Sequence, residues 1–426
     1  MFSFAYFRDG VETKDRPILF CFNGGPGSSS MYVHAGFFST KRLKYEEVDR
    51  STSLPPYEVI DNPDCLLDVA DIVCIDPVGT GYGILFDESK RKDFFGIEED
   101  AEALLMFVER WLHKYNRWTS PKYLIGESYG CTRAAVAAGL SVNGCKEREY
   151  GMRFDGIVMI GNTVTVGKYF GKGVPAEPSV LNFPTFAAIN HYHNKVSDQS
   201  VEEFAMEAKA FADSEYLLAL YKGEALEEAK KEEIIKKITY YTNMDREYLI
   251  RNALKIEEDT FRQEVIKDQN MAVSRYDGRV KRPFYSPMVE EVKDGIEVDA
   301  TANRYDGFYY GALTGHIFPM LNIKLDRPYV PCCPLWKDWN RESETITTAK
   351  RLRNAMKDTM GMRIFFANGW YDDCTEIGHV FYTIDHAGLP KDRVFVKGYA
   401  SGHMIYLGEE NSKELSKDIR NFIKCI

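Results

Sequence analysis

The chain has 426 residues, 44% of them hydrophobic and 28% charged, a balance typical of a soluble globular protein. This length suits one large α/β domain with an insertion. The formal net charge of −10 argues against nucleic acid as a partner, because phosphate binding needs clustered positive charge. No apolar run approaches the roughly 20 residues that span a bilayer, so we expect no membrane partner.

The first ten residues alternate in polarity and end in a turn signal, Asp9-Gly10, which is typical of a strand. They lack the basic region, apolar core and cleavage site of a signal peptide, so we expect a cytoplasmic protein. The abrupt start is compatible with a further segment upstream. Nine cysteines are present, and Cys21 and Cys74 lie in apolar runs. Buried free thiols, few or no disulfides and a reducing compartment are therefore expected.

Several short apolar runs are typical of buried strands in a mostly parallel sheet. They are residues 18–22, 71–75, 123–125, 157–160, 363–367 and 394–397. Helical segments separate several of them. Residues 97–115 begin with an acidic turn, which suits the helix dipole, and carry apolar side chains at helical spacing. Alternating strands and helices predict a doubly wound α/β sheet flanked by helices.

A glycine-rich loop, residues 23–30 with the sequence NGGPGSSS, follows the first of these strands. Glycines allow the backbone to approach a substrate closely, and backbone N–H groups in such a loop can stabilise a developing oxyanion. The alternatives are a plain turn or a phosphate loop. A phosphate loop would need Gly-Lys-Ser or G-x-G-x-x-G spacing, and neither is present.

Residues 126–130 read GESYG, between the apolar run 123–125 and the small-residue segment 131–138. This pattern indicates a strand, a sharp turn and a helix, with Ser128 at the apex. A G-x-S-x-G in that context is the nucleophile elbow of an α/β-hydrolase. Because a serine hydroxyl is a poor nucleophile at neutral pH, it needs a base and a group that orients the base.

The alternating pattern stops near Gly167. Residues 197–270 favour helices and include the capping-box signal of residues 200–203, whereas residues 276–334 are rich in Tyr, Gly and Pro and are predicted to be irregular. We interpret this part as a cap over the site. The predicted organisation is a hydrolase core in residues 1–166, a mainly helical cap insertion in residues 167–335 and the rest of the core in residues 336–426.

Candidate acids and a candidate base follow the two last predicted strands, in the order Ser, Asp, His of α/β-hydrolases. Asp372 and Asp373 follow residues 363–367, and His403, flanked by glycine, follows residues 394–397. Only one of the neighbouring aspartates can orient the base, and the other is expected to be a solvated turn residue. The H-x-H pair His191 and His193 could bind a metal but has no obvious third ligand, so we predict neither metal nor cofactor.

Together these blocks resemble a known family. The segments NGGPGSSS, GESYG and Gly402-His403-Met404 are similar to the three signature blocks of the serine carboxypeptidases, the S10 peptidases. Residues 76–82 and 95–101 fit as well, and residues 367–372 fit in the form typical of bacterial members. The resemblance runs from about residue 17 to residue 407 and implies an α/β-hydrolase fold with a helical cap.

The resemblance implies roles for individual residues. It makes Ser128 the nucleophile, His403 the base and Asp372 the residue that orients the base. It places the oxyanion donors at the backbone N–H groups of Gly25 and Tyr129.

It also implies that Asn23 and Glu127 hold the terminal carboxylate of the substrate. Glu127 would then have to be protonated, because two adjacent anions repel each other. Two departures stand out. Ser28 occupies the place of a cysteine that is usually disulfide-bonded in the family, and Phe37 lies near the place of a glutamate that supports carboxylate recognition in many eukaryotic members.

The sequence thus predicts a serine carboxypeptidase that releases C-terminal residues from peptide substrates through an acyl-enzyme. A serine esterase or acyltransferase with the same triad is the first alternative. A non-catalytic binding protein on a hydrolase scaffold is the second. The oligomeric state and the preferred residues around the cleaved bond stay open.

Overall fold

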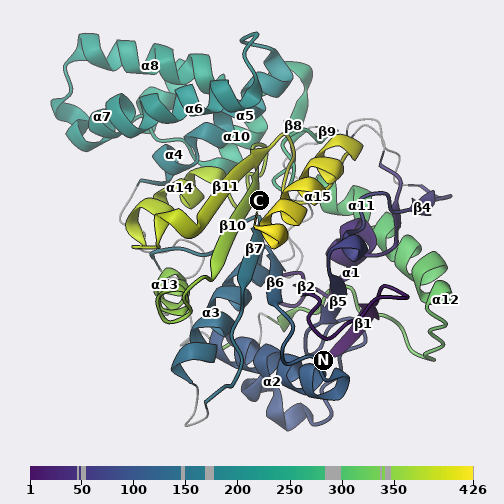
Figure 1. Cartoon of the computed structure of the whole chain (residues 1–426). Coiled ribbons are helices and arrows are strands. Elements are labelled where there is room, and N and C mark those ends of the chain that lie inside the picture. The colour runs from purple at the N-terminus through teal and green to yellow at the C-terminus, as the bar shows by residue number, and fades with distance from the viewer. Residues whose placement is uncertain are drawn as a thin grey trace.

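A seven-stranded sheet forms the centre of the molecule in the computed structural model (Figure 1). The structure describes residues 1–45, 48, 54–144, 149–167, 177–283, 299–335, 338–340 and 347–425. The strand order is β1-β5-β2-β6-β7-β10-β11. The bounds are β1 (Phe2–Tyr6), β2 (Ile18–Phe22), β5 (Asp71–Asp76), β6 (Lys122–Glu127), β7 (Gly156–Ile160), β10 (Arg363–Gly369) and β11 (Val394–Tyr399). β1 pairs antiparallel with β5, and the remaining pairs are parallel, which confirms the predicted doubly wound sheet.

Helices cover both faces of the sheet, which explains why its central strands are continuous apolar runs. On one face α2 (Ile97–Tyr115), α3 (Tyr129–Asn143) and α13 (Thr348–Asp358) pack in a core that includes Phe20. On the other face α15 (Glu409–Lys424) and α11 (Ala300–Ala312) pack in a core that includes Leu19. Successive residues of β2 thus serve opposite cores, as the two-residue period of a strand requires.

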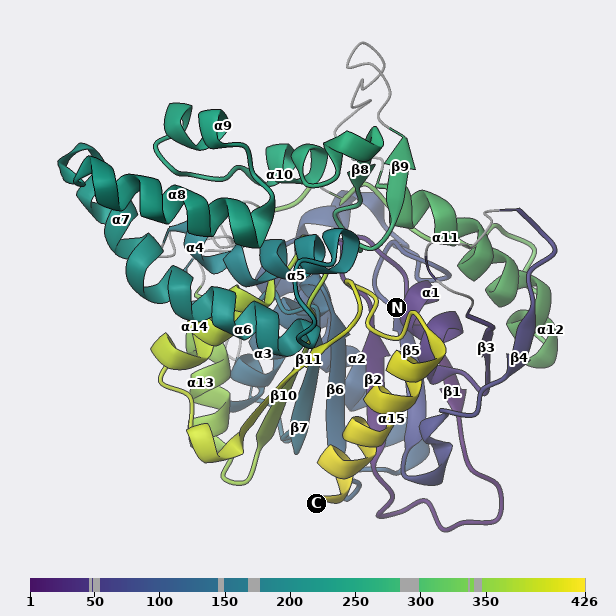
Figure 2. The same ribbon diagram turned by 90° about the horizontal axis from the view of Figure 1, so that it is seen from above.

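A group of helices between β7 and β10 lies outside the sheet, and its hydrophobic core, which includes Phe183, Phe186 and Ile238, also takes in Trp370 and Tyr371 after β10 (Figures 1 and 2). They are α4 (Pro178–Leu181), α5 (Phe183–Asn194), α6 (Val201–Phe211), α7 (Leu217–Lys222), α8 (Glu228–Thr242), α9 (Arg246–Arg251) and α10 (Glu258–Glu264). The predicted capping box is confirmed, since Ser200 and Glu203 bond to each other's backbone N–H groups at the start of α6.

The prediction that residues 276–334 are irregular is wrong for α11. Asp299 caps this helix, because its carboxylate accepts hydrogen bonds from the N–H groups of Thr301 and Ala302. Tyr305 and Tyr309, four residues apart, are buried on one face of it. Glycines and tyrosines have weak helix propensity, so tertiary packing rather than local sequence forms this helix.

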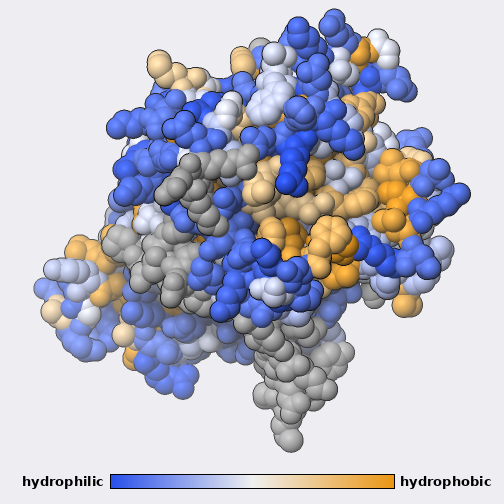
Figure 3. All heavy atoms as spheres, turned by 90° about the horizontal axis from the view of Figure 1, so that it is seen from below, coloured by the Kyte–Doolittle hydropathy of each residue, from blue (hydrophilic) through white to orange (hydrophobic). Residues whose placement is uncertain are grey.

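The remaining strands and α-helices of the described chain lie outside these groups in the order of elements. They are β3 (Lys41–Leu43), β4 (Val59–Asp61), β8 (Met271–Val273), β9 (Lys281–Pro283), α1 (Met31–Val33), α12 (Phe318–Met320) and α14 (Ile377–His386). The eight cysteines within the described ranges are all free. The face seen in Figure 3 is mainly hydrophilic around a hydrophobic central area. Within the described residues, no helix is both long and apolar enough to cross a membrane.

Candidate active site

Ser128 lies at a sharp turn between β6 and α3. Its backbone has φ 60° and ψ −130°, a left-handed region that costs a non-glycine residue free energy. The turn is tight because Gly126 and Gly130 meet, and a Cβ atom on Gly126 would collide with the backbone of Gly130. The Ser128 N–H donates to Ile160 O of β7 at 2.8 Å, which fixes the turn to the sheet. This is the strand–turn–helix geometry that a nucleophile elbow requires.

The glycine-rich loop lies directly against this turn. A Cβ atom on Gly24 would collide with Tyr129 N and lie 2.8 Å from Glu127 O, so only glycine allows the approach. The Arg133 side chain holds the loop in place: it donates to Asn23 O at 2.6 Å. The structure therefore brings the segment that contains Gly25 beside the N-terminus of α3, where Tyr129 is the first helical residue.

The loops after β10 and β11 bring the candidate acid and base together. His403 Nδ1 and Asp372 Oδ2 are 2.9 Å apart. Asp372 Oδ1 accepts the backbone N–H groups of Cys374 at 2.9 Å and Thr375 at 3.0 Å. The two loops can meet because Gly369 has no side chain, and a Cβ atom there would collide with the backbone of the His403 loop.

Electrostatics favour a charged Asp372 beside His403. Burial alone would raise the pKa of Asp372, but the charge of His403 and the hydrogen bonds from His403 and Thr375 lower it. Burial alone would lower the pKa of His403, but the charge and hydrogen bond of Asp372 raise it above its ordinary value. The pair thus holds His403 as a basic imidazole with a fixed ring orientation, which is what a general base needs.

Gly161, the residue after β7, lies next to both Ser128 and His403 and so places them at the same edge of the sheet. A Cβ atom on Gly161 would lie 2.9 Å from both Cε1 and Nδ1 of His403, and the preceding residue, Ile160, accepts the Ser128 N–H. Within the described residues, the Ser128 hydroxyl forms no hydrogen bond to His403. Such bonds are often absent without substrate and tighten in the reacting complex.

Two further residues hold the imidazole, and sequence reasoning missed both. The Thr375 hydroxyl donates to Asp372 Oδ2 and lies 3.2 Å from His403 Nδ1. The Tyr276 ring stacks on the His403 ring at a centroid distance of 5.2 Å, and the backbone carbonyl of Tyr276 accepts a hydrogen bond from the backbone N–H of His403 at 2.6 Å. Thr375 lies three residues after Asp372, which is a weak signal, and no local pattern singles out Tyr276.

The expectation that the second aspartate is a solvated turn residue is wrong. Asp373 is fully buried, and its Oδ2 pairs with Arg262 of α10 at 2.6 Å. Asp373 N also donates to Arg275 O at 3.0 Å. Adjacent side chains in a turn point in different directions, so Asp372 faces His403 while Asp373 faces the helical group.

Asn23 and Glu127 meet beside the elbow. Asn23 Nδ2 donates to Glu127 Oε1 at 2.6 Å, and Asn23 Oδ1 accepts the Val33 N–H at 3.1 Å. Glu127 Oε2 is buried and forms no hydrogen bond of normal geometry with the described residues, although the Tyr406 hydroxyl is close enough to lower the pKa of this carboxyl group. Burial raises the pKa of Glu127 to about 7. In mildly acidic solution the carboxyl group is therefore largely protonated, and its Oε2 can serve as a donor to a ligand.

Aromatic side chains lie beside Glu127. The Tyr406 hydroxyl faces Glu127, although it too is buried without a hydrogen-bond partner in the described chain. Phe37 is buried and its ring stacks on Tyr406 at 5.9 Å. At the place where many eukaryotic members carry a glutamate, this chain therefore has an apolar wall.

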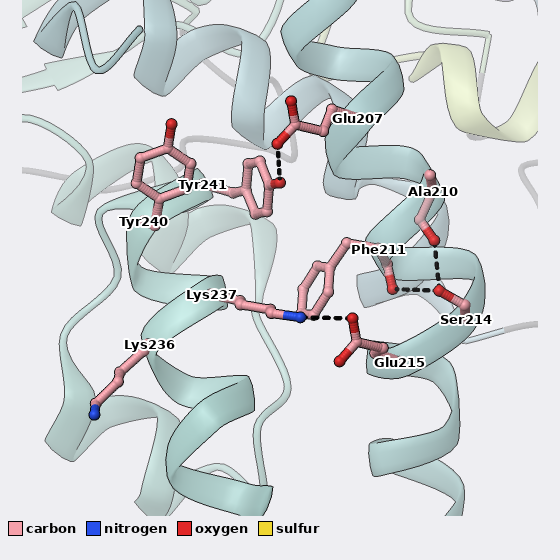
Figure 4. A pocket seen from close by; sticks show the side chains of 9 residues that line it. All are labelled: Glu207, Ala210, Phe211, Ser214, Glu215, Lys236, Lys237, Tyr240 and Tyr241. Carbon is pink, nitrogen blue, oxygen red and sulfur yellow. Dashed lines mark hydrogen bonds and ion pairs between the residues drawn. The ribbon is translucent and has the colours of Figure 1, made fainter.

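The other candidate sites do not bring catalytic side chains together in this way. His193 bonds to Gly278 O at 2.6 Å and His191 packs on Phe204, and within the described residues neither belongs to a group with metal-ligand geometry. The group that has such geometry is Asp372, Cys374 and His403, which overlaps the acid–base pair. A hollow on the helical group contains no candidate residue (Figure 4). Lys237 pairs there with Glu215 at 2.6 Å, and Glu207 accepts a hydrogen bond from the Tyr241 hydroxyl at 2.6 Å.

The chain was compared with known proteins and solved structures. The crystal structure of Kex1(delta)p, a prohormone-processing carboxypeptidase from Saccharomyces cerevisiae, is 16% identical with a TM-score of 0.54, and the match covers 99% of this chain and 86% of that chain. Proline iminopeptidase from Mycobacterium smegmatis is 11% identical with a TM-score of 0.41, covering 99% and 94%. Homoserine O-acetyltransferase from Bacillus anthracis is 10% identical with a TM-score of 0.41, covering 99% and 91%. No curated protein sequence matches the chain.

The Kex1(delta)p match supports the predicted α/β-hydrolase fold. The sequence profile described as serine carboxypeptidase, peptidase S10, matches residues 1–312. The matched region includes the glycine-rich loop and the elbow, while Asp372 and His403 lie beyond it. Because the profile spans well over half of the 426 residues, the chain belongs to the serine carboxypeptidase family and is a serine-type hydrolase of that family.

Proposed function

We propose that this enzyme releases the C-terminal residue of peptides through an acyl-enzyme formed on Ser128. His403 takes the hydroxyl proton as Ser128 attacks the last peptide carbonyl, and it returns the proton to the leaving amine. Asp372 orients the imidazole. Water then attacks the ester, with His403 again acting as base, and the shortened peptide leaves.

The backbone N–H groups of Gly25 and Tyr129 are the proposed oxyanion donors. Their segments lie side by side, and the N-terminus of α3 adds the positive end of a helix dipole. Each such donor contributes about 3 kcal/mol to transition-state stabilisation in comparable sites.

The observation that carries the exopeptidase proposal is the buried pair of Asn23 and Glu127 beside the nucleophile. Asn23 orients one oxygen of Glu127, and the other oxygen forms no hydrogen bond of normal geometry in the described chain. With a pKa of about 7, Glu127 is largely neutral in mildly acidic solution. A neutral carboxyl group can donate a hydrogen bond to the terminal carboxylate of a peptide, whereas an ionised one would repel it.

The helical group supports selection for chain ends. We propose the division into core residues 1–166, cap residues 167–335 and core residues 336–426, with the cap beside the loops that hold His403. Tyr276 from this insertion stacks on the imidazole, and Arg262 pairs with the turn after Asp372. A cap in that position would restrict access to small substrates and chain ends.

The test compares a blocked dipeptide with a free C-terminal carboxylate against the same dipeptide as its amide. The purified enzyme should strongly prefer the free acid. Ser128→Ala should abolish turnover, while the matched variant Ser141→Ala, a buried serine elsewhere in α3, should retain it. Asn23→Ala should remove the preference for the free acid and leave hydrolysis of the amide largely unchanged.

Phe37 in place of an acid makes a serine esterase or acyltransferase the one alternative worth testing. Equal turnover of the acid and the amide, or faster turnover of an alkyl ester, would favour that alternative. Labelling of Ser128 by a fluorophosphonate probe separates both from an inert scaffold, since only an activated serine reacts. Unchanged turnover by Ser128→Ala would overturn the mechanism itself.

A further inference from the structure

A half-buried thiol lies in the same turn as Asp372 and has no role in the proposed mechanism. Cys374 follows Asp372 by two residues, and its backbone N–H donates to Asp372 Oδ1, so the turn is folded around the carboxylate. Within the described residues, the Cys374 thiol forms neither a hydrogen bond nor a disulfide. By contrast, the Cys131 thiol, three residues after Ser128, donates to Gly126 O at 3.2 Å. The sulfur of Cys374 is therefore free to bind a ligand that reaches it from its exposed side.

Three different metal-ligating groups meet at this point. A carboxylate oxygen of Asp372, the sulfur of Cys374 and a ring nitrogen of His403 all lie within 4.8 Å of one another. In a tetrahedral zinc site each ligand atom is about 2.0–2.3 Å from the metal, which puts the ligand atoms roughly 3.5 Å apart. Asp372 Oδ2 and His403 Nδ1, at 2.9 Å, are already within that spacing. Only the Cys374 side chain would have to move, by about 1 Å, to complete such a site.

The three donor atoms favour one class of cation. Thiolate sulfur and imidazole nitrogen are preferred by Zn²⁺ and similar thiophilic ions, whereas Mg²⁺ and Ca²⁺ prefer oxygen ligands. A carboxylate and a thiolate together also balance the charge of a divalent ion. Three protein ligands would leave the fourth tetrahedral position to water. Within the described residues, no other group of three such side chains has this spacing.

The surroundings of the three groups would hold them in place around an ion. Asp372 is fully buried and His403 is 6% exposed, so water and salt screen their charges little. The Thr375 hydroxyl donates to Asp372 Oδ2 and lies 3.2 Å from His403 Nδ1. Hydrogen bonds from such neighbouring groups orient metal ligands and strengthen binding. An ion can enter from the side of Cys374, because Cys374 is the one member of the group that is not fully buried.

We propose that Asp372, Cys374 and His403 form an inhibitory site for Zn²⁺ or a similar thiophilic divalent cation. The thiol proton is released to solvent as the sulfur–metal bond forms. A neutral imidazole has one N–H and one lone pair, and the metal takes the lone pair. Whichever ring nitrogen binds the ion, His403 then has no lone pair left to accept the Ser128 proton. The loss of activity rests on the proposed role of His403 as base, whereas binding of the ion does not.

Binding is measured by titration of CdCl₂ into the full-length enzyme, with the thiolate-to-metal charge-transfer absorption in the ultraviolet as the signal. Wild type and Ser128→Ala should both show one tight-binding equivalent that Cys374→Ser lacks. Cys65→Ser, which removes another half-buried thiol in the segment before β5, is the matched control and should retain that equivalent. The same signal in Cys374→Ser, or no tight-binding equivalent in wild type, would overturn the site.

Inhibition is measured as the ratio of kcat/KM with and without ZnCl₂ on a blocked dipeptide acid, so that a change in a variant's own turnover cancels. Saturating zinc should abolish hydrolysis by wild type, EDTA should restore it, and MgCl₂ should have no effect. In Cys374→Ser the zinc concentration for half-inhibition should rise by at least about tenfold, because loss even of a group that only orients a ligand costs about 10–100-fold in affinity.

The outcomes separate this inference from the proposed function. Equal sensitivity of wild type and Cys374→Ser to zinc, or inhibition that EDTA does not reverse, would overturn the inhibitory site and leave the carboxypeptidase proposal intact. Absence of hydrolysis of every dipeptide acid by wild type would overturn the carboxypeptidase proposal, while the cadmium titration would still decide whether the three residues bind a metal ion.

Discussion

Arg262 of α10 pairs with Asp373 at 2.6 Å, so a helix outside the sheet is tied to the turn that carries Asp372. Asp373 is fully buried and the Arg262 side chain is only 10% exposed. The ion pair is therefore largely removed from water. One end of it is the chain neighbour of the proposed orienting residue, which makes the pair a structural support for the acid–base couple.

Loss of this pair should destabilise the fold strongly. Breaking a buried ion pair by removing one partner costs about 3–5 kcal/mol, because the other charge stays buried. Arg262→Met should reduce the free energy of unfolding by this order. Burial already raises the pKa of Asp373, so protonation relieves the unpaired charge and the loss should be smaller at pH 5 than at pH 8.

Urea unfolding at the two pH values measures this effect. Arg246→Met is the matched control, because Arg246 pairs with Glu232 in the same helical group but is 50% exposed. A surface pair of that kind is worth no more than about 1 kcal/mol. Asp373→Asn should partly rescue Arg262→Met. Equal decreases in the free energy of unfolding for Arg262→Met and Arg246→Met would contradict this prediction.

The sequence was sufficient for the framework of the sheet. Residues 18–22 and 97–115 were predicted with the bounds that the structure gives to β2 and α2, because a buried apolar run and an amphipathic period are local patterns. The elbow around Ser128 was predicted for the same reason, since the glycines that permit it lie within two residues of the serine.

The parts that sequence reasoning missed depend on contacts between distant segments. Tyr276 reaches His403 across more than a hundred residues of chain, and Arg262 reaches Asp373 in the same way. No spacing rule connects such pairs. The burial of Asp373 could not be inferred either, because the partner that allows a carboxylate to be buried lies on another element.

We expect the Thr375 hydroxyl to increase kcat by supporting the Asp372–His403 pair. Its hydroxyl donates to the same Asp372 oxygen that faces His403, and a hydrogen bond to a charged group is worth about 1.5–3 kcal/mol. Thr375→Val keeps the shape and removes the donor, so we expect kcat to fall by about tenfold and the free energy of unfolding to fall by about 1.5–3 kcal/mol. Thr375→Ser should restore activity.

Steady-state kinetics and a thermal unfolding curve check this prediction. Thr383→Val is the matched control, because Thr383 of α14 is also buried but donates to Val164 O rather than to Asp372. A fall in kcat that serine does not rescue, or an equal fall in the control, would indicate a packing effect instead.

Glu127 should lower stability at neutral and alkaline pH. Its pKa is about 7 in the folded protein, against an ordinary value of 4.5 in the unfolded chain. The folded state therefore retains a proton that the unfolded state has lost. The associated stability is fully present below pH 4.5 and is lost as the pH rises through about 7, by an amount on the order of 3 kcal/mol.

Glu127→Gln removes this ionisation, so at pH 8 the variant should unfold at a higher temperature than wild type. Its amide can still donate to a carboxylate, so KM for a free-acid dipeptide should lose the rise with pH that wild type shows above about 7. Glu224→Gln, at an exposed site on the helical group, is the control for both measurements. If KM still rose with pH in Glu127→Gln, a group other than Glu127 would be responsible for that rise.

The sharpest test of the proposed triad compares Asp372→Asn with Asp373→Asn, because the two substitutions make the same chemical change one position apart in the chain. Asp372 raises the pKa of His403, and the imidazole acts as a base only when neutral. Activity on a dipeptide amide or ester, which does not need Glu127, should therefore rise as the pH rises through the pKa of His403. In Asp372→Asn the pKa of His403 falls. The acidic limb of the pH–activity profile, where activity rises with pH, should therefore move to lower pH, while kcat falls by about 10⁴-fold.

Asp373→Asn removes a carboxyl group from the same turn, but this group faces Arg262 and not His403. Measured at a temperature where both variants are folded, Asp373→Asn should keep the wild-type acidic limb and most of kcat. Because the two substitutions make the same chemical change, any difference between them comes from which side chain contacts the imidazole. If Asp373→Asn shifted the limb and Asp372→Asn did not, the 2.9 Å contact of Asp372 with His403 would not be the one that sets the basicity of the histidine.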